Sequence, residues 1–196
     1  MKYLKSLFLL FVFLNFYIAS YSIEPDIFVQ STVNRASKIL SENISKEEKM
    51  NKLKQIAKET VDIEGIGYYT LGKKRKEITS EQLKSYESIF EKYFLKSFTS
   101  RLTDYSDPKI NVLSSEVVND KYTIVKTMLL KTDKKPEVKI DWRVYTNDPN
   151  NPLIRDLIIE GLSLARTQKE EFSSILNSND NDINILFKTL KDFSNS

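Results

Sequence analysis

The spacing of apolar residues changes near Lys109, and this change places the fold in the α+β class. Before residue 109, apolar side chains recur every three or four positions, which is the period of an amphipathic helix. After residue 109 the period becomes that of alternating strands, and a helical period returns only near the C-terminus. The sequence therefore predicts N-terminal helices, a four-stranded twisted antiparallel sheet and two C-terminal helices.

Helix signals in the first half place four helices. Ser45 with Glu48 and Thr79 with Gln82 form capping boxes, in which each pair can satisfy free backbone N–H groups at a helix start. Apolar residues follow each box at helical spacing, and Gly72 suits the end of the short helix that precedes the second box. We expect helices over residues 25–42, 45–61, 62–71 and 79–102.

Three of the four glycines, Gly65, Gly67 and Gly72, lie close together, which raises the alternative of a phosphate-binding loop. Such a loop needs a further correctly spaced glycine or a following Lys-Ser or Lys-Thr pair, and this segment has neither. We therefore expect Gly65 and Gly67 to let their helix approach its neighbours closely.

The second half carries four strand signals and then two helix signals. The segment 121–131 is apolar on both faces, which is typical of an interior strand. Short connections, including the Asn- and Pro-rich turn at 147–152, favour antiparallel pairing. Strands are expected from residue 110, over 121–131, over 137–146 and over 153–159, and helices over 163–176 and 182–193, the last with Asp182 as its N-cap.

The N-terminus has the features of a secretory signal peptide. Lys2 and Lys5 precede an apolar stretch over residues 7–18, which ends in small residues before Ser22. This stretch is shorter than the roughly 20 residues that a membrane-spanning helix needs, so a retained anchor is the weaker alternative. We expect a signal peptide over residues 1–22 and a single domain over 23–196, exported by the Sec route and soluble after cleavage. Residues 1–22 carry two lysines and no acid, so cleavage lowers the formal net charge from +3 to +1.

The residue types that are missing narrow the possible chemistry. The chain has no histidine and no cysteine, so it cannot form a Ser-His-Asp triad, a thiolate nucleophile or the usual zinc site. Paired carboxylates remain an option, because Asp141, Asp156 and Glu160 lie on or near predicted strands. Ordinary solvated acids at strand ends are the simpler interpretation. We expect no enzyme activity, no catalytic residues, no metal and no cofactor.

The order of motifs over most of the mature chain resembles the MlaC family of periplasmic phospholipid carriers, also known as toluene-tolerance proteins. An LG pair precedes a T-x-x-Q helix, four strands follow, and an E-G-x-S turn leads into the final helices. The chain departs from the family at Gln168-Lys169, where members commonly have Tyr-Arg. The residues that carry the resemblance are Leu71, Gly72, Thr79, Gln82, Phe90, Leu102, Trp142, Asp156, Glu160, Gly161, Ser163, Glu171, Phe172, Ile175 and Leu176.

The resemblance implies an apolar cavity between helices and sheet that encloses the acyl tails of a transported phospholipid. It also implies a role in outer-membrane lipid asymmetry, through exchange with an inner-membrane ABC transporter that has an MCE-domain subunit and with an outer-membrane lipoprotein–porin complex. We expect a periplasmic monomer that does not bind nucleic acid. We nominate as tail contacts the apolar positions that face the presumed space between helices and sheet: Ile66, Tyr69, Phe90, Phe94, Met128, Leu130, Trp142, Val144, Leu164 and Phe172.

Alternatives stay open at this point. The same apolar residues could be plain core, and the protein could be a periplasmic protein-binding module or chaperone without a lipid cavity. An enzyme would need Asp141 close to Asp156 or Glu160. The basic cluster at residues 73–76 could touch lipid headgroups or an acidic partner, or it could be a solvated loop.

Overall fold

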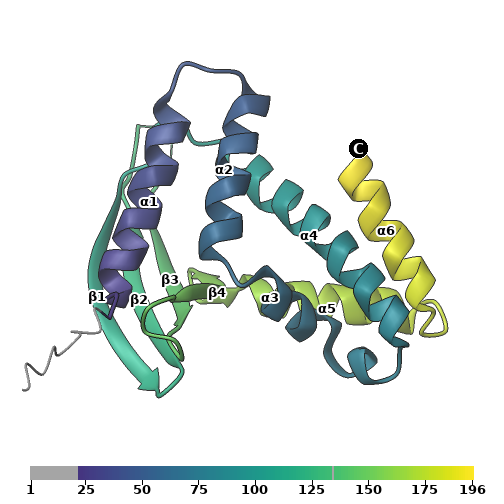
Figure 1. Ribbon diagram of the computed structural model, residues 1–196. Helices are drawn as coiled ribbons and strands as arrows, with labels where there is room; N and C mark the ends of the chain where they lie inside the picture. The colour runs from purple at the N-terminus through teal and green to yellow at the C-terminus, as the bar shows by residue number, and fades with distance from the viewer. Residues whose placement is uncertain (1–21, 134) are drawn as a thin grey trace, which may run out of the picture.

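The computed structural model of the chain describes residues 22–133 and 135–196, and these form helices packed on and beside one antiparallel sheet (Figure 1). The predicted signal peptide lies outside the described residues, apart from Ser22. The helices are α1 (Pro25–Ser41), α2 (Lys46–Thr60), α3 (Ile63–Leu71), the 3-10 helix η1 (Gly72–Lys76), α4 (Ser80–Leu102), α5 (Leu164–Asn177) and α6 (Ile183–Asn195). The strands are β1 (Ile110–Asn119), β2 (Tyr122–Leu129), β3 (Val138–Tyr145), β4 (Leu153–Ile159) and β5 (Leu162–Ser163).

The predicted α+β class is confirmed, but the strand count needs one correction. A fifth strand, β5, pairs with the end of β4, where Ile159 lies opposite Leu162. Glu160 and Gly161 join the two strands with φ values of +49° and +83°. Positive φ at both central residues is characteristic of a two-residue hairpin turn. The E-G pair therefore forms a hairpin first, and α5 begins after it.

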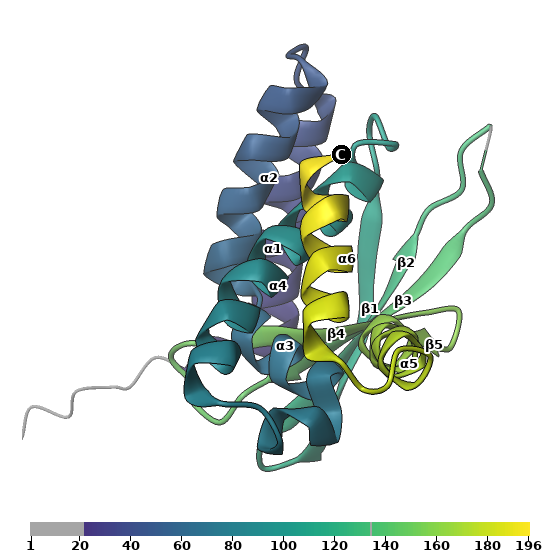
Figure 2. The ribbon, with the colours of Figure 1, turned by 90° about the vertical axis from the view of Figure 1, so that its right-hand side faces the viewer.

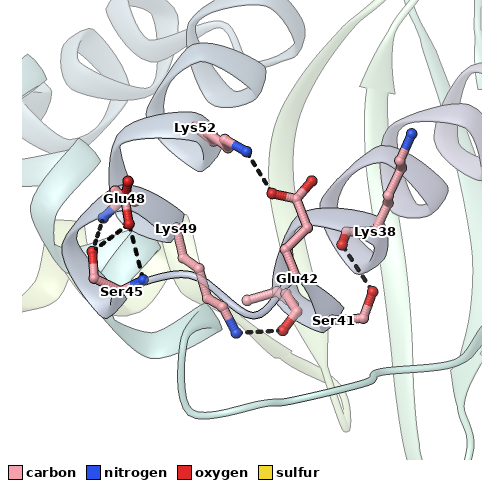
Figure 3. A network of polar contacts seen from close by, with 8 residues as sticks. Lys38, Ser41, Glu42, Ser45, Glu48, Lys49 and Lys52 are labelled. Atoms are coloured by element: carbon pink, nitrogen blue, oxygen red, sulfur yellow. Dashed lines mark hydrogen bonds and ion pairs between the residues drawn. The ribbon is translucent and has the colours of Figure 1, made fainter.

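The helix starts predicted at Ser45, Thr79 and Asp182 are confirmed by their hydrogen bonds. Glu48 N donates to Ser45 Oγ over 3.2 Å, and Ser45 N donates to Glu48 Oε2 over 3.0 Å (Figure 3). Thr79 and Gln82 form the same capping box at the start of α4, and the Asp182 side chain caps α6. Near the turn between α1 and α2, Lys49 Nζ donates to the Leu40 carbonyl over 2.7 Å, which holds the adjoining ends of the two helices together (Figure 3).

The strands run in the order β1-β2-β3-β4-β5, and every neighbouring pair is antiparallel. Strand β2 lies inside the sheet, as its sequence predicts. Helix α1 lies along β1 and β2, whereas α4 and α6 lie side by side at the other end of the molecule (Figures 1 and 2). The two halves are joined where Val61 bridges Ile154 and Asp62 N donates to the Ile154 carbonyl over 2.9 Å. Within the part of the chain that the structure describes, no helix has the length and apolar character needed to cross a membrane.

A buried aromatic cluster connects α3, α4, α5 and α6. Tyr86 of α4 is fully buried, and its ring centroid lies 5.5 Å from that of Phe90. The Tyr86 hydroxyl lies 2.9 Å from Thr70 Oγ1 and donates to the Gly67 carbonyl over 3.1 Å. Burial raises the pKa of Tyr86, so the hydroxyl keeps its proton and this hydrogen bond at neutral pH. The contact brings α3 close to α4.

Gly67→Ala should destabilise the protein, because α3 approaches α4 too closely for a side chain here. A Cβ atom at this position would lie 2.8 Å from Cδ1 of Phe90, whose side chain is itself buried. Overpacking of this kind costs about 1–3 kcal/mol. This cost equals or exceeds the gain of about 1 kcal/mol in helix propensity. Urea denaturation should show a lower free energy of unfolding by about 1 kcal/mol. Equal or higher stability would show that Phe90 can move aside.

Candidate functional site

The candidate site is a cavity of about 140 Å³ where α4 and α5 meet the sheet at β3 and β4. One wall is the side of α4 that faces α5, and the opposite walls come from the start of α5 and from the two strands. Residues from the end of α2 and from α3 complete it. The lining residues are Val61, Ile66, Phe90, Tyr93, Phe94, Ser97, Phe98, Arg101, Trp142, Ile154, Asp156, Leu157, Leu164, Ala165, Thr167, Gln168 and Glu171.

The interior of the cavity is apolar and aromatic. Phe90, Phe94 and Phe98 follow one another at four-residue spacing on α4 and therefore share one helix face. Phe94 and Phe98 are stacked, with ring centroids 5.6 Å apart and planes inclined by 11°. Both rings are only partly buried, whereas Phe90 is 2% exposed. The aromatic wall thus runs from the buried core outward to the surface.

The rim of the cavity is polar and connects two helices. The Tyr93 hydroxyl of α4 donates to Gln168 Oε1 of α5 over 2.7 Å, and Gln168 Nε2 donates to Glu171 Oε2 over 2.8 Å. Burial raises the pKa of Tyr93, and the nearby carboxylate of Glu171 acts in the same direction. Tyr93 therefore remains a neutral hydrogen-bond donor at physiological pH. Arg101, which is exposed, adds a positive charge to this rim.

Asp156 is the acid on the cavity wall that is most buried, and its contacts are structural. Its side chain accepts hydrogen bonds from Ser163 Oγ over 2.6 Å and from Ala165 N over 3.0 Å. Arg143 Nη1 lies 3.8 Å from Asp156 Oδ2. These contacts fix the start of α5 against β4, so the carboxylate has a structural role.

The three acids that could have formed a catalytic pair are not gathered in one cleft. Asp156 lines the cavity, whereas Asp141 and Glu160 do not. Asp141 lies opposite Lys126 of β2 in the sheet, and Glu160 accepts a hydrogen bond from Lys139 N over 2.6 Å at the β4–β5 turn. Among the residues that the structure describes, no group of three or more acidic side chains is arranged to hold a metal ion.

Five of the ten nominated tail contacts line the cavity, and five lie elsewhere. The five lining residues are Ile66, Phe90, Phe94, Trp142 and Leu164. Val144 and Phe172 are buried in the core, at 0% and 1% exposure, and do not line the cavity. Tyr69 and Leu130 are 45% and 37% exposed.

Met128 lies on the other face of the sheet from the buried residues of β2. The buried residues in this strand are Thr123, Val125, Thr127 and Leu129, which alternate with Met128. Trp142 Nε1 donates to Thr127 Oγ1 over 3.0 Å, which holds Thr127 on the side of the tryptophan. Thr127 therefore lies on the inner face, where its hydroxyl accepts the hydrogen bond of the buried indole, although a polar residue would be expected on the outer face.

Sequence reasoning missed several lining residues, and helical spacing could have found some of them. Tyr93, Ser97 and Arg101 are four residues apart on α4, beside the row of phenylalanines. Gln168 follows Leu164 by one helical turn on α5. Ile154 and Leu157 belong to a strand, and only the pairing of β4 with β3 brings them to the cavity.

A sequence model described as MlaC protein matches residues 30–192. Among curated proteins, none matches the chain significantly. A solved structure of a phospholipid-binding protein from Ralstonia solanacearum, in complex with a phospholipid, superposes with a TM-score of 0.73. The two sequences are 17% identical, and the alignment covers 88% of this chain and 97% of the Ralstonia protein. At this identity the comparison establishes a shared fold.

Proposed function

Because this chain belongs to the MlaC protein family, we propose that it is a phospholipid carrier that holds acyl tails in the cavity between α4, α5 and the sheet. The observation that carries this proposal is the aromatic wall of Phe90, Phe94 and Phe98, which continues from the core to the surface. The similar protein from Ralstonia solanacearum was solved with a phospholipid, which supports the same class of ligand.

The chemistry that a carrier needs is exclusion of water. Each methylene group removed from water is worth about 0.8 kcal/mol, so two tails with roughly 30 methylenes resist exposure by about 25 kcal/mol. A lipid therefore crosses an aqueous space only if its tails are covered. Such a task needs no catalytic residue, and the proposed function is binding and transport without catalysis.

Loading requires the cavity to widen. Its volume of about 140 Å³ is close to that of a cavity that holds one benzene molecule, roughly 150 Å³. Two acyl tails are much larger, so α4 and α5 must separate as a lipid enters. The hydrogen bond from Tyr93 to Gln168 spans this opening and would break. A hydrogen bond contributes about 1 kcal/mol net, so breaking it costs little compared with the free energy gained by burying the tails.

The mixed charge of the rim favours a carrier that accepts different headgroups. Arg101 is positive and Glu171 is negative, and both are exposed, so the rim does not select one headgroup charge. We expect phosphatidylethanolamine and phosphatidylglycerol with the same tails to bind within about threefold of each other. Strong loss of binding on changing only the headgroup would contradict this expectation.

We place this carrier in the periplasm after cleavage of the signal peptide, where it would act as a monomer. Its proposed exchange partners are an inner-membrane ABC transporter with an MCE-domain subunit and an outer-membrane lipoprotein–porin complex. Movement of phospholipid between these complexes would maintain outer-membrane lipid asymmetry.

A transfer assay tests the carrier function. Donor vesicles containing a fluorescent phospholipid and unlabelled acceptor vesicles are separated by a membrane that passes only the protein. We expect the protein to raise the transfer rate at least about tenfold above the rate without protein, because it removes the cost of exposing tails to water. Addition of the two candidate membrane complexes should raise the rate further. No acceleration under either condition would refute the proposal.

A second candidate function, binding of an extended protein segment, is favoured by the edge strand β1. Leu113, Val117 and Val118 on this strand are 61%, 76% and 56% exposed. Exposed edge strands can pair with a strand of another protein. A protein that never carries lipid, yet binds a peptide that pairs with β1, would place this function first.

A further inference from the structure

A second cavity, of about 730 Å³, lies on the other side of the cavity wall, and we call it the basic cleft. Its four cations are Arg75 of η1, Arg143 of β3, Arg155 of β4 and Lys169 of α5. Its volume falls within the roughly 300–1,000 Å³ that is typical of ligand sites. The proposed binding of tails in the first cavity and the hydrogen bonds of its rim do not involve this cleft.

The basic cleft has an excess of positive charge. Asp156 is the acid in its lining, and the hydrogen bonds from Ser163 and Ala165 already engage that carboxylate. Arg155 is ion-paired with Asp62 outside the lining, and its guanidinium also lies 3.7 Å from the centre of the Tyr145 ring. Arg155 therefore forms a fixed part of the wall.

The remaining three cations keep donors for a ligand. The Arg143 side chain is 41% exposed, and its 3.8 Å separation from Asp156 is too long for a hydrogen bond. Lys169 Nζ lies 4.9 Å from the Tyr69 ring centre, and Arg75 lies 5.2 Å from the Tyr68 ring centre. Within residues 22–133 and 135–196, Arg75 and Lys169 have no carboxylate at ion-pair distance.

The basic cleft and the tail cavity share a thin wall. Ile66, Asp156 and Ala165 line both, so one layer of side chains separates the aromatic interior from the cations. The cleft also has an apolar margin, where Tyr69 and Val118 are 45% and 56% exposed. A site with clustered cations beside an apolar surface suits an anionic group that is attached to an apolar body.

We propose that the basic cleft binds the phosphodiester of the phospholipid whose tails enter the cavity, with the glycerol passing between Ile66 and Ala165 as the cavity widens; this rests on the proposed carrier function. Arginine and lysine are the residues that bind phosphate oxygens, and arginine can do so with two parallel hydrogen bonds. All glycerophospholipids carry this phosphodiester. The site therefore distinguishes phospholipids from neutral lipids with the same tails, and it does not read the variable headgroup.

Competition between two lipids tests this assignment. The protein is incubated with vesicles of dioleoylphosphatidylglycerol that contain dioleoylglycerol, and the ratio of the two bound lipids is measured by native mass spectrometry. The double variant Arg75→Glu/Lys169→Glu should lower the ratio of phospholipid to diacylglycerol at least about tenfold, because charge-assisted hydrogen bonds to the phosphate are lost. Arg143→Gln, which keeps Asp156 bonded to Ser163 and Ala165, should lower it in the same direction.

The matched control is Lys73→Glu/Lys188→Glu, which makes the same charge change at two exposed lysines outside the cleft. Its lipid ratio should equal that of the wild type, and thermal unfolding should confirm that both double variants are folded. Equal ratios in all three proteins would overturn the phosphate site while leaving the carrier function intact. Equal ratio losses in the two double variants would show a general charge effect and would also overturn it. A wild-type protein that retains neither lipid would refute the carrier function itself.

Discussion

Leu164→Glu should strongly weaken lipid binding in a protein that still folds. Leu164 lines the tail cavity at the first position of α5, where an acidic residue is compatible with the helix N-terminus. A carboxylate in the cavity would have to lose its hydration when acyl tails arrive, at a cost of several kcal/mol. We expect phospholipid affinity to fall at least about 30-fold, equivalent to about 2 kcal/mol, in a binding titration with fluorescent lipid.

Leu162→Glu is the control for this variant. It makes the same chemical change two residues earlier, at a side chain that is 61% exposed and outside the cavity lining. It should bind lipid like the wild type. Full lipid loading of folded Leu164→Glu would show that the tails lie somewhere else.

Phe172→Ala should produce the opposite pattern, a large loss of stability without a specific loss of lipid. Phe172 is 1% exposed and lies outside the cavity lining. Its ring packs edge-on against Phe90 with centroids 6.2 Å apart and lies 5.9 Å from the ring of Tyr93. Removing a buried phenylalanine ring costs about 3–5 kcal/mol, which should appear as a lower free energy of unfolding in urea.

Phe193→Ala provides the comparison, because Phe193 belongs to the same aromatic cluster but is 40% exposed. We expect the free energy of unfolding to fall by about 1 kcal/mol or less, because the substitution removes little buried apolar surface. Lipid bound per folded molecule should stay at the wild-type level in both variants. Loss of lipid by folded Phe172→Ala would return Phe172 to the group of tail contacts.

Much of the fold follows from local signals in the sequence. The capping boxes at Ser45 and Thr79 and the N-cap at Asp182 fix helix starts, because each depends on residues only two or three positions apart. The change of period near Lys109 identifies the boundary between helices and sheet. Strand β5 was missed because two residues carry no period; the pairing of Ile159 with Leu162 and the positive φ values of the turn between them reveal the hairpin.

The candidate site was harder to predict, because it depends on which face each element buries. On α4 the four-residue spacing of Phe90 and Phe94 indicates the correct face. On β2 both faces are apolar enough to be buried, and the pairing of Thr127 with the Trp142 indole determines the choice. Val144 shows the remaining difficulty: a fully buried side chain and a cavity-lining side chain have the same sequence signal.

Native mass spectrometry of protein purified from the periplasm without detergent, followed by lipid identification after organic extraction, tests whether this chain carries phospholipid. We predict one phospholipid per protein molecule for the wild type and for Leu162→Glu, and an unliganded mass for Leu164→Glu. An unliganded wild-type mass that persists after incubation with phospholipid vesicles and the candidate membrane complexes would contradict the carrier function.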